Sequence, residues 1–436
     1  MMYILYSLLL ACALLLSLPW WALQVLRLGK YRAGLSERLG FVPPRLRGHA
    51  KPGCVWIHAV SVGEVLAVSH LVRELQRRYP QKTVFVSTTT ATGQRLARER
   101  FGETQVFFMP LDFGFAVRAY LDLLRPSLLI LAETEFWPNL LHLAAKRGSP
   151  VAIVNARVSD RSFPRYRRFR RFFAEVLSEV DLFLAQTEED AQRLREIGAT
   201  KERVRVSGNL KFDVRNADGS ELREDLQRAI ARDSFVIVCG STTEGEEELL
   251  LRAFQEVLRR RPSAVTVMAP RHPERFDKVA ALIAAQRIPM VRRSSWKARG
   301  PAAACPISGA VFLLDSVGEL ASVYALAAVA FVGGSLLPGV GGHNILEPAQ
   351  YGVPVLVGPN TANFREIVSI FERGGGLKTV TATSLAGELL QLLDAPEERR
   401  RLGQQARELF LTNTGATART LEALQPLLGR LPAQVK

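Results

Sequence analysis

The chain is 436 residues long and carries a net charge of +15, with 57 Lys and Arg against 42 Asp and Glu. This length allows two domains of about 150 to 200 residues each, and the charge indicates an anionic partner: nucleic acid, an acidic membrane surface or a phosphorylated substrate. The four cysteines (Cys12, Cys54, Cys239 and Cys305) are far apart and lack C-x-x-C spacing, which argues against a zinc site and for a reducing compartment.

The N-terminus is apolar and uncharged from Met1 to Leu26, which is about enough helix to cross a bilayer. No positively charged leader precedes it and no small-x-small cleavage site follows it, which argues against a removed signal peptide. We therefore predict an uncleaved membrane anchor over residues 1–28. The alternative is an apolar helix that lies in one leaflet, an arrangement favoured by Pro19 and the Trp20-Trp21 pair.

A basic segment, residues 29–50, follows the anchor. It and its borders contain Arg27, Lys30, Arg32, Arg38, Arg45, Arg47 and Lys51, opposed only by Glu37. Because positive charge flanking an anchor stays on the cytoplasmic side, we expect the body of the protein on the cytoplasmic side of the membrane. The same cluster could rest on anionic headgroups.

From Lys51 onward, short β-branched runs alternate with longer amphipathic segments, which is typical of parallel α/β architecture. The expected strands are 54–59, 83–87, 105–109, 128–132, 151–154, 182–185 and 204–207, then 235–239, 264–268, 311–314, 328–332 and 353–357. The polar segment Asp213 to Asp233 separates the two sets. We predict Rossmann-like domains at 51–212 and 213–394 that face a cleft, a loop from Trp296 to Ser308, and C-terminal helices at 395–436 that pack back across the domains.

The stretch from Phe331 to Gly358 reads as a strand, a glycine-rich loop, a helix from about His343 or Asn344, and a second strand. Such glycines let the backbone approach a ligand, and a helix start favours an anion, most simply a phosphate. Glu347 is placed to accept hydrogen bonds from a ribose. The spacing differs from G-x-G-x-x-G, so a mononucleotide is the better prediction than a dinucleotide. The plain alternative is a tight loop with a solvated helix start.

Polar groups follow most of the predicted strands, where ligands bind in open parallel sheets. Ser61-Val62-Gly63-Glu64 follows the first strand; it is also a capping box for a helix from about Val62 to Arg77. Glu133 follows another apolar strand, and burial there would raise its pKa unless a cation lies near. The alternative for Glu133 is a structural hydrogen bond.

Two basic side chains, Lys211 and Arg271, are candidates to meet a phosphate, whereas His272 could be an imidazole that only packs in a loop. No D-x-D motif and no His/Asp cluster with ligand spacing is present, so we expect no obligatory metal and no cofactor. No Ser-His-Asp or Cys-His arrangement stands out.

Arginines and aromatic side chains alternate between Arg161 and Phe173. Such a run could bind RNA, contact lipid phosphates or form a solvated helix face. The apolar N-terminus favours the membrane, so we expect Arg167, Arg168, Arg170 and Arg171 to contact the membrane, and we expect no nucleic-acid partner.

Eight ordered motifs resemble one family over nearly the whole chain: IHAVSVGE, AETEFWPNLL, NARVSDRS, GNLKFD, GSTTEGEE, APRHPERF, FVGGS and GGHNILEPA. With the N-terminal anchor, they are similar to the Kdo transferases of lipopolysaccharide biosynthesis. The resemblance implies a GT-B fold and an inverting, metal-independent transfer of 3-deoxy-D-manno-octulosonic acid (Kdo) from CMP-Kdo to the lipid A precursor (lipid IVA). It also implies that the catalytic domains lie at the cytoplasmic face of the inner membrane, where Arg167, Arg168, Arg170 and Arg171 would contact this acceptor or the membrane.

Carried over by position, the resemblance implies that Glu64 is the proton acceptor and that Glu133 and Lys211 stabilise the transition state. It implies CMP contacts at Pro270, Arg271, Val317, Gly318, Glu319, Asn344, Ile345, Leu346 and Glu347. The loop 336–340 departs from the family pattern because it is longer and less charged, and Ser36 stands where Gly is common. Two alternatives stay open at this point: a membrane-tethered RNA-binding protein and a related GT-B enzyme that uses a UDP-sugar.

Overall fold

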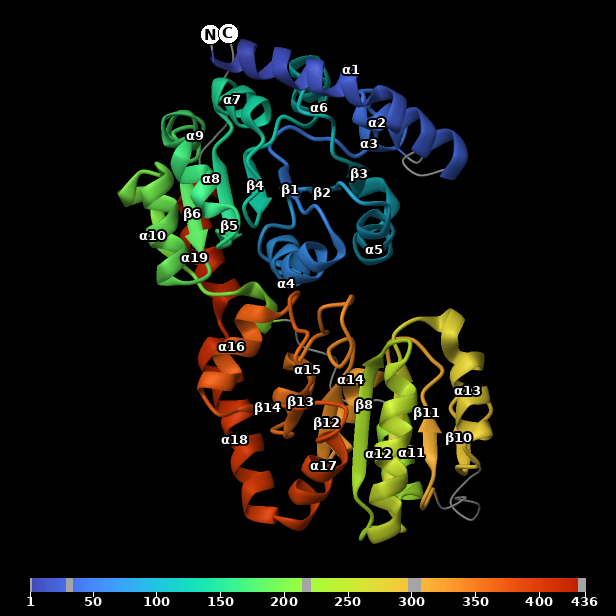
Figure 1. Cartoon of the computed structure of the whole chain (residues 1–436). Helices are drawn as coiled ribbons and strands as arrows, with labels where there is room; N and C mark the ends of the chain where they lie inside the picture. Colours follow the sequence, from blue (N-terminus) through green and yellow to red (C-terminus); the bar gives the residue numbers. More distant parts are fainter. Residues whose placement is uncertain (1, 29–33, 214–220, 297–306, 430–436) are drawn as a thin grey trace. The chain divides into compact units, whose positions relative to one another are not determined.

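A computed structural model describes residues 2–28, 34–213, 221–296, 307–429 of the chain. The chain divides into two compact units: unit 1 comprises residues 1–214 and 414–436, and unit 2 comprises residues 215–413. Each unit is built on one seven-stranded parallel sheet (Figure 1). The predicted α/β class with two Rossmann-like domains is confirmed.

Unit 1 has the strand order β3-β2-β1-β4-β5-β6-β7. Its strands are β1 (Val55–His58), β2 (Val84–Thr88), β3 (Val106–Phe108), β4 (Leu128–Ala132), β5 (Val151–Ala156), β6 (Leu182–Ala185) and β7 (Val204–Val206). Its helices are α1 (Met2–Leu28), α2 (Leu35–Arg38), α3 (Pro44–Arg47), α4 (Val62–Arg78), α5 (Ala91–Phe101), α6 (Gly114–Leu124), α7 (Pro138–Lys146), α8 (Phe163–Arg168), α9 (Arg170–Leu177), α10 (Glu188–Ile197) and α19 (Ala416–Leu428).

Unit 2 has the strand order β10-β11-β9-β8-β12-β13-β14. Its strands are β8 (Val236–Thr242), β9 (Val265–Pro270), β10 (Met290–Arg292), β11 (Val311–Leu313), β12 (Val329–Val332), β13 (Val355–Val357) and β14 (Leu377–Thr379). Its helices are α11 (Glu221–Ala229), α12 (Glu246–Arg260), α13 (Phe276–Ala285), α14 (Leu320–Val323), α15 (Leu346–Ala349), α16 (Arg365–Arg373), α17 (Leu385–Asp394) and α18 (Pro396–Asn413).

Both faces of the first sheet are covered, which explains why its strands read as continuous apolar runs. Along β4, Leu129 and Leu131 enter one hydrophobic core with Trp56, while Leu128 and Ile130 enter a second core on the opposite face. This alternation follows from the two-residue repeat of a strand. The second core is closed by α4 and by leucines of α19.

The C-terminal helices divide between the units. Helix α18 belongs to unit 2 and packs on α17, while α19 belongs to unit 1 and contacts α4. The chain thus returns to unit 1 at residue 414, and the predicted linker from Asp213 to Asp233 contains α11. The predicted loop at Trp296 to Ser308 lies mainly outside the described residues.

The basic segment after the anchor packs into unit 1 rather than forming a free tether. Leu46 is buried in the first core, and the carboxylate of Glu37 accepts hydrogen bonds from Arg45 (2.6 Å) and from the backbone N–H of Phe108 (2.8 Å). Lys30 and Arg32 lie outside the described residues. Helix α1 contains the one stretch among the described residues, Met2–Pro19, that is long and apolar enough to cross a membrane.

Candidate active site

The strand order of unit 1 reverses between β1 and β4, which are neighbours in the sheet although β2 and β3 lie between them in sequence. In open parallel sheets the crevice for ligands lies beyond the carboxyl ends of the strands at such a point. The loop after β1 leads to Glu64, and the loop after β4 begins with Glu133. The topology therefore brings two of the predicted site residues to one place.

Glu64 lies in the first turn of α4 and is buried. Its carboxylate accepts a hydrogen bond from the backbone N–H of Val60 (2.7 Å) and one from the hydroxyl of Ser61 (3.1 Å). The predicted capping box is therefore wrong in detail. Ser61 occupies the N-cap without accepting a backbone hydrogen bond, and Glu64 reaches one residue further back than a capping box requires.

The pKa of Glu64 is raised to about 8, mainly by burial and next by the negative charge of Glu133; the hydrogen bond from Val60 opposes the rise. Glu135, whose role we did not predict, has a pKa raised to about 7 by burial and by the same Glu133 charge. Three carboxyl groups thus interact, and two of them exchange protons near neutral pH. Such a cluster is suited to general acid-base chemistry.

Glu133 is held in the left-handed backbone region, with φ 59°, directly after β4. Its carboxylate lies 3.6 Å from the ammonium nitrogen of Lys211. Lys211 is therefore a cation close enough to Glu133 to stabilise a negative charge on its carboxylate. A non-glycine residue in this backbone region is uncommon, and such strain often accompanies functional sites.

Lys211 is positioned by the short 3₁₀ helix η3 (Leu210–Asp213). The amide side chain of Asn155, buried within β5, accepts a hydrogen bond from the N–H of Leu210 (2.9 Å). At the other end, Asp213 accepts hydrogen bonds from the N–H groups of Gly415 (2.6 Å) and Thr417, at the start of α19. The returning helix α19 therefore fixes the turn that carries Lys211.

In unit 2 the strand order reverses between β8 and β12. The glycine-rich loop follows β12, and the start of α12 follows β8. Glu246 joins them: its buried carboxylate accepts hydrogen bonds from the N–H groups of Gly334 (2.7 Å), Ser335 (3.0 Å) and Leu336 (2.8 Å), and from Thr243. Sequence reasoning missed this role because the partners lie 88 to 90 residues away.

The loop leaves no room for a side chain at Gly333. A Cβ there would lie 2.6 Å from the carbonyl oxygen of Ser241 and 2.7 Å from Cα of Thr242. Gly334 has φ 69°, and a Cβ there would lie 2.7 Å from the ring of His343. These glycines let the backbone fold tightly over the end of β8.

Three residues of the predicted nucleotide site, Arg271, Asn344 and Glu347, influence one another, and Arg271 also acts on the neighbouring His343. The positive charge of Arg271, after β9, opposes the burial that raises the pKa of Glu347. Burial and the same Arg271 charge lower the pKa of His343 to about 4. Glu347 also accepts a hydrogen bond from the amide of Asn344 (3.2 Å). The structure therefore brings Arg271 together with the segment Asn344, Ile345, Leu346 and Glu347.

The other predicted nucleotide contacts follow β11, which pairs with β9. Val317 is exposed, and Gly318 has φ 91° with no atom near the position of a Cβ. Glu319 is engaged by Arg293 (2.9 Å) and Ser316. Pro270 ends β9 on the same edge of the sheet.

The predicted helix from about His343 is wrong. Helix α15 covers only Leu346–Ala349, and the N–H of Leu346 is already bonded to the side chain of Asn344 (3.1 Å). One turn of this kind has little dipole and few free N–H groups. The argument for a phosphate at this helix start therefore fails, and Arg271 remains as a charged group for a phosphate.

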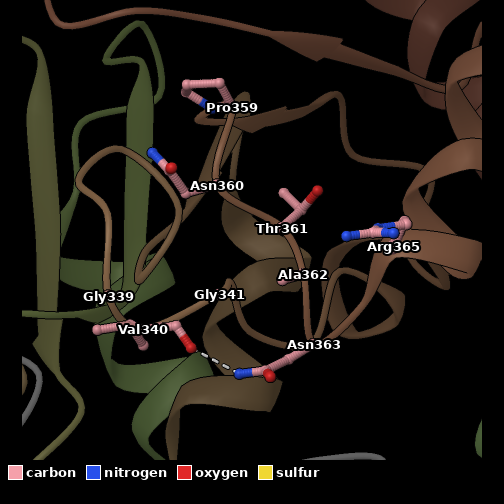
Figure 2. A pocket seen from close by; sticks show the side chains of 9 residues that line it. All are labelled: Gly339, Val340, Gly341, Pro359, Asn360, Thr361, Ala362, Asn363 and Arg365. Atoms are coloured by element: carbon pink, nitrogen blue, oxygen red, sulfur yellow. Dashed lines mark hydrogen bonds between the residues drawn. The ribbon is translucent and has the colours of Figure 1, made fainter. Parts of the chain in front are cut away.

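A pocket of about 450 Å³ adjoins the glycine-rich loop. Figure 2 shows its lining residues: Gly339, Val340, Gly341, Pro359, Asn360, Thr361, Ala362, Asn363 and Arg365. The amide of Asn363 donates to the carbonyl of Val340 (2.6 Å) and so ties the two walls together. Arg365, the first residue of α16, points along the Thr361–Asn363 wall and contributes a positive charge.

The arginine-aromatic run forms two short helices, α8 and α9, that meet at Phe169. Arg167, Arg168, Arg170 and Arg171 are all exposed, while Phe172 and Phe173 pack against the first core. The arrangement presents charge to the surroundings and hides most of the aromatic surface.

Two family models each match one part of the chain. Residues 33–214 match the family described as 3-deoxy-D-manno-octulosonic-acid transferase (kdotransferase), and residues 294–409 match glycosyl transferases group 1. The 3-deoxy-D-manno-octulosonic acid transferase of Haemophilus influenzae is 36% identical over 408 residues, covering 92% of this chain and 93% of that protein. This chain belongs to the Kdo transferase family. The enzyme of that name from Bordetella pertussis is 37% identical over 387 residues, covering 86% of this chain and 87% of its own.

Solved structures show the same fold at low identity. A putative UDP-N-acetylglucosamine 2-epimerase from Listeria monocytogenes has a TM-score of 0.56 and 16% identity, covering 88% of this chain and 100% of its own. A glycosyltransferase from Rickettsia africae has a TM-score of 0.54 and 11% identity, covering 87% and 100%. The Kdo transferase chain therefore shares the GT-B-like architecture of nucleotide-sugar enzymes.

Membership in the Kdo transferase family favours an enzyme over the RNA-binding alternative. Glu135 and Glu246 are the residues that the sequence analysis did not single out. Both stand inside the quoted motifs AETEFWPNLL and GSTTEGEE: Glu135 lies two residues after Glu133, and Glu246 lies two residues after Glu244. A carboxylate that follows a buried strand within such a motif was the available signal for both.

Proposed function

We propose that this chain transfers Kdo from CMP-Kdo to the phosphorylated glucosamine disaccharide of the lipid A precursor, with inversion at the anomeric carbon. The observation that carries the proposal is Glu64: a buried carboxyl group with a pKa of about 8, beside the Lys211–Glu133 pair, at the carboxyl edge of the sheet. The family relatives that bear the name Kdo transferase support the substrate class.

Glu64 acts as the general base. Its carboxylate accepts the proton of the attacking hydroxyl group of the acceptor as that oxygen bonds to the anomeric carbon of Kdo, and the bond from this carbon to the CMP phosphate breaks. A raised pKa makes the carboxylate a stronger base, at the cost of a smaller ionised fraction at neutral pH. The hydrogen bonds from Val60 and Ser61 hold the group in one orientation.

Glu133 and Lys211 stabilise the transition state. Positive charge develops at the anomeric carbon and negative charge on the departing phosphate, so a fixed carboxylate and a fixed ammonium group favour the reacting state over the bound substrate. Lys211 is held by backbone hydrogen bonds at both ends of η3, which keeps its charge preorganised.

Unit 2 binds the donor. Arg271 pairs with the phosphate of CMP, the carboxylate of Glu347 accepts hydrogen bonds from the ribose, and the backbone at Pro270 and at Val317–Glu319 contacts the remainder of the nucleotide. The polar pocket beside Gly341 takes the hydroxyl-rich sugar acid, whose carboxylate pairs with Arg365. None of these roles uses a metal ion, and the described residues hold no group of three or more His, Cys, Asp or Glu with metal-site geometry.

The test is the variant Glu64→Gln, which keeps the shape and removes the base. Wild-type protein incubated with CMP-Kdo and lipid A precursor should add Kdo mass to the lipid, and the variant should lose roughly 10²-fold or more of that rate. CMP should protect both proteins equally against thermal unfolding. The matched control is Glu74→Gln on the same helix, where the carboxylate pairs with Arg77. Normal turnover by Glu64→Gln would remove the assignment.

A further inference from the structure

Helix α1 has two distinct faces over its described side chains. Half-buried residues recur at helical spacing and form one stripe along unit 1: Met2, Tyr3, Tyr6, Ser7, Leu10, Ala11, Leu14 and Ser17. The other face is exposed and wholly apolar: Ile4, Leu5, Leu8, Leu9, Cys12, Ala13, Leu15, Leu16, Leu18 and Pro19. Every polar side chain between residues 2 and 19, apart from the thiol of Cys12, lies in the half-buried stripe.

The start of the stripe is attached to unit 1 by specific contacts. The ring of Tyr3 stacks on that of His142 with centroids 3.9 Å apart, and both side chains bond to the carboxylate of Glu179, Tyr3 at 3.2 Å and His142 at 2.8 Å. The hydroxyl of Ser7 accepts a hydrogen bond from the amide of Asn139 (3.0 Å). These are contacts of a docked helix.

Asn139 is itself part of a buried network. Its backbone N–H and its side chain both donate to Asp112, whose pKa burial raises to about 7. The amide that receives α1 is therefore fixed by the core of unit 1. Figure 1 shows α1 running along unit 1 over α7 rather than projecting from it.

This geometry is incompatible with a helix that crosses a bilayer while it stays docked. The docked stripe from Met2 to Ser17 is about 22 Å long at 1.5 Å per residue. The hydrocarbon layer is about 30 Å thick, so most of the length that crosses it would be in contact with unit 1. A crossing helix would carry Asn139, His142 and the charged Glu179 into hydrocarbon, where such groups are costly.

The exposed face nevertheless requires a partner, because Leu16 is 84% exposed, Ile4 67% and Leu5 58%. Contiguous apolar surface of this kind is unfavourable in water. The exposed arginines of α8 and α9 lie close by in the same unit, since Tyr6 of α1 contacts Phe172 of α9 with ring centroids 6.5 Å apart. Apolar surface beside positive charge matches the hydrocarbon and the anionic headgroups of one leaflet.

We propose that α1 lies in the plane of the membrane, with its leucine face in one leaflet and its Tyr3–Ser7 edge docked on α7 and Glu179, so that the chain's N-terminus and both units share one side of the membrane. The occupant of the exposed face is an anionic phospholipid leaflet. This inference is independent of the proposed reaction, because its readout is topology and not activity.

Cross-linking tests whether docking persists in the membrane. The variant Ser7→Cys with Asn139→Cys, in a chain with Cys12 and Cys305 replaced by Ser, should form a disulfide when membranes that contain the full-length protein are oxidised. The matched control is Ser17→Cys with Asn139→Cys, on the same stripe but about 15 Å further along the helix, which should stay reduced. A second pair, Tyr3→Cys with His142→Cys, covers the case in which loss of Asn139 prevents folding. Absence of cross-linking in both test pairs would overturn the proposal.

Topology gives an independent answer. A single cysteine placed before Met1 should react with a membrane-impermeant maleimide from the same side of sealed vesicles as a reporter at Ala382→Cys, an exposed position in unit 2. A spanning helix would place the two reporters on opposite sides, so that one reacts only after the vesicles are permeabilised. That result would show that α1 crosses the bilayer.

Discussion

Glu64, Glu133 and Glu135 carry three potential negative charges, and the ammonium group of Lys211 lies 3.6 Å from the carboxylate of Glu133. Burial and the charge of Glu133 raise the pKa values of Glu64 and Glu135 to about 8 and about 7, so these two carboxyl groups hold their protons more tightly than ordinary glutamates do. This division of roles follows from environment alone, since all three side chains have the same chemistry.

The variant Glu133→Gln tests the division. Removing the charge of Glu133 should lower the pKa of Glu64 from about 8, because that charge is the second cause of its rise. A base with a lower pKa is ionised at lower pH, so the rising limb of the profile of kcat/KM against pH should move to lower pH. The maximum should also fall by roughly tenfold or more, the scale for loss of one electrostatic stabiliser.

The profile of Glu74→Gln, on the outer part of α4, should match that of the wild type. If Glu133→Gln lowers the maximum and leaves the limb in place, Glu133 does not tune Glu64. Glu135 would then be the remaining carboxylate whose charge raises the pKa of Glu64.

At the scale of single elements, the loop after β12 depends on one distant carboxylate. Glu246 satisfies three consecutive backbone N–H groups of the loop and the hydroxyl of Thr243. An amide in its place offers one oxygen and brings two donors that find no acceptors among those N–H groups. The glycine-rich loop is therefore shaped as much by α12 as by its own glycines.

We expect Glu246→Gln to destabilise unit 2 by on the order of 2–4 kcal/mol, the range for leaving buried partners of a charged group unsatisfied. Thermal protection by CMP should weaken, because the loop borders the proposed donor site. The control Glu248→Gln removes a neighbouring carboxylate that forms an exposed pair with Arg252, and such pairs contribute about 0–1 kcal/mol. Equal unfolding temperatures for the two variants would contradict the role of Glu246.

The strands of both sheets were predictable because parallel strands covered on both faces are apolar along their whole length, as in β4. Strands β10 and β14 were not predicted. Both are three-residue edge strands, and they include the charged residues Arg292 and Lys378, which pair with Asp277 and Glu388. Short edge strands carry little of the apolar signal on which such a prediction depends.

Helix lengths were harder to predict where tertiary contacts decide them. The helix expected near Asn344 is four residues long, because the side chain of Asn344 already binds the N–H of Leu346 and the chain turns again at Gly352, which has φ 70°. The arginine-aromatic run forms two helices that meet at Phe169, and Tyr166 of the first and Phe173 of the second both pack against Phe136. Neither contact is visible in a local sequence pattern.

The candidate site was predictable where a motif follows a strand, as with Glu64, Glu133 and Arg271. Its electrostatics were not. The pairing of Lys211 with Glu133 joins residues 78 positions apart by way of η3 and α19, and the proton affinity of Glu64 depends on burial that only the fold creates. The sequence therefore indicates which side chains to consider, but the raised pKa of Glu64 depends on burial and on neighbours that come together only in the folded chain.

At the scale of the whole molecule, an exposed apolar surface and a group of exposed arginines lie in the same unit. Unit 1 carries α1 and the arginines of α8 and α9, and it also holds the proposed base. An acceptor that is a phosphorylated lipid has to meet all three features, since its acyl chains stay in the membrane while its headgroup reaches Glu64. We therefore expect the arginines to contribute to use of the lipid acceptor and not to donor binding.

The variant with Arg167, Arg168, Arg170 and Arg171 replaced by Gln tests this expectation on vesicles that contain lipid A precursor. Each arginine near an anionic surface contributes on the order of 1 kcal/mol, so the loss of all four should raise the apparent KM for the lipid by up to about a thousandfold at low ionic strength. The increase should shrink at high salt, because screening already weakens the attraction for the wild type. Thermal protection by CMP should be unchanged, since the proposed donor site lies in unit 2.

The matched control replaces four exposed arginines of unit 2 by Gln: Arg259, Arg260, Arg400 and Arg401. It lowers the net charge of the chain by the same amount and leaves α8 and α9 intact. If the effect arises from net charge alone, both quadruple variants should lose acceptor use equally, and the arginines of α8 and α9 would have no special position. If instead only the first variant is impaired, and only at low salt, the arginine face of unit 1 attracts the acceptor phosphates beside the docked helix α1.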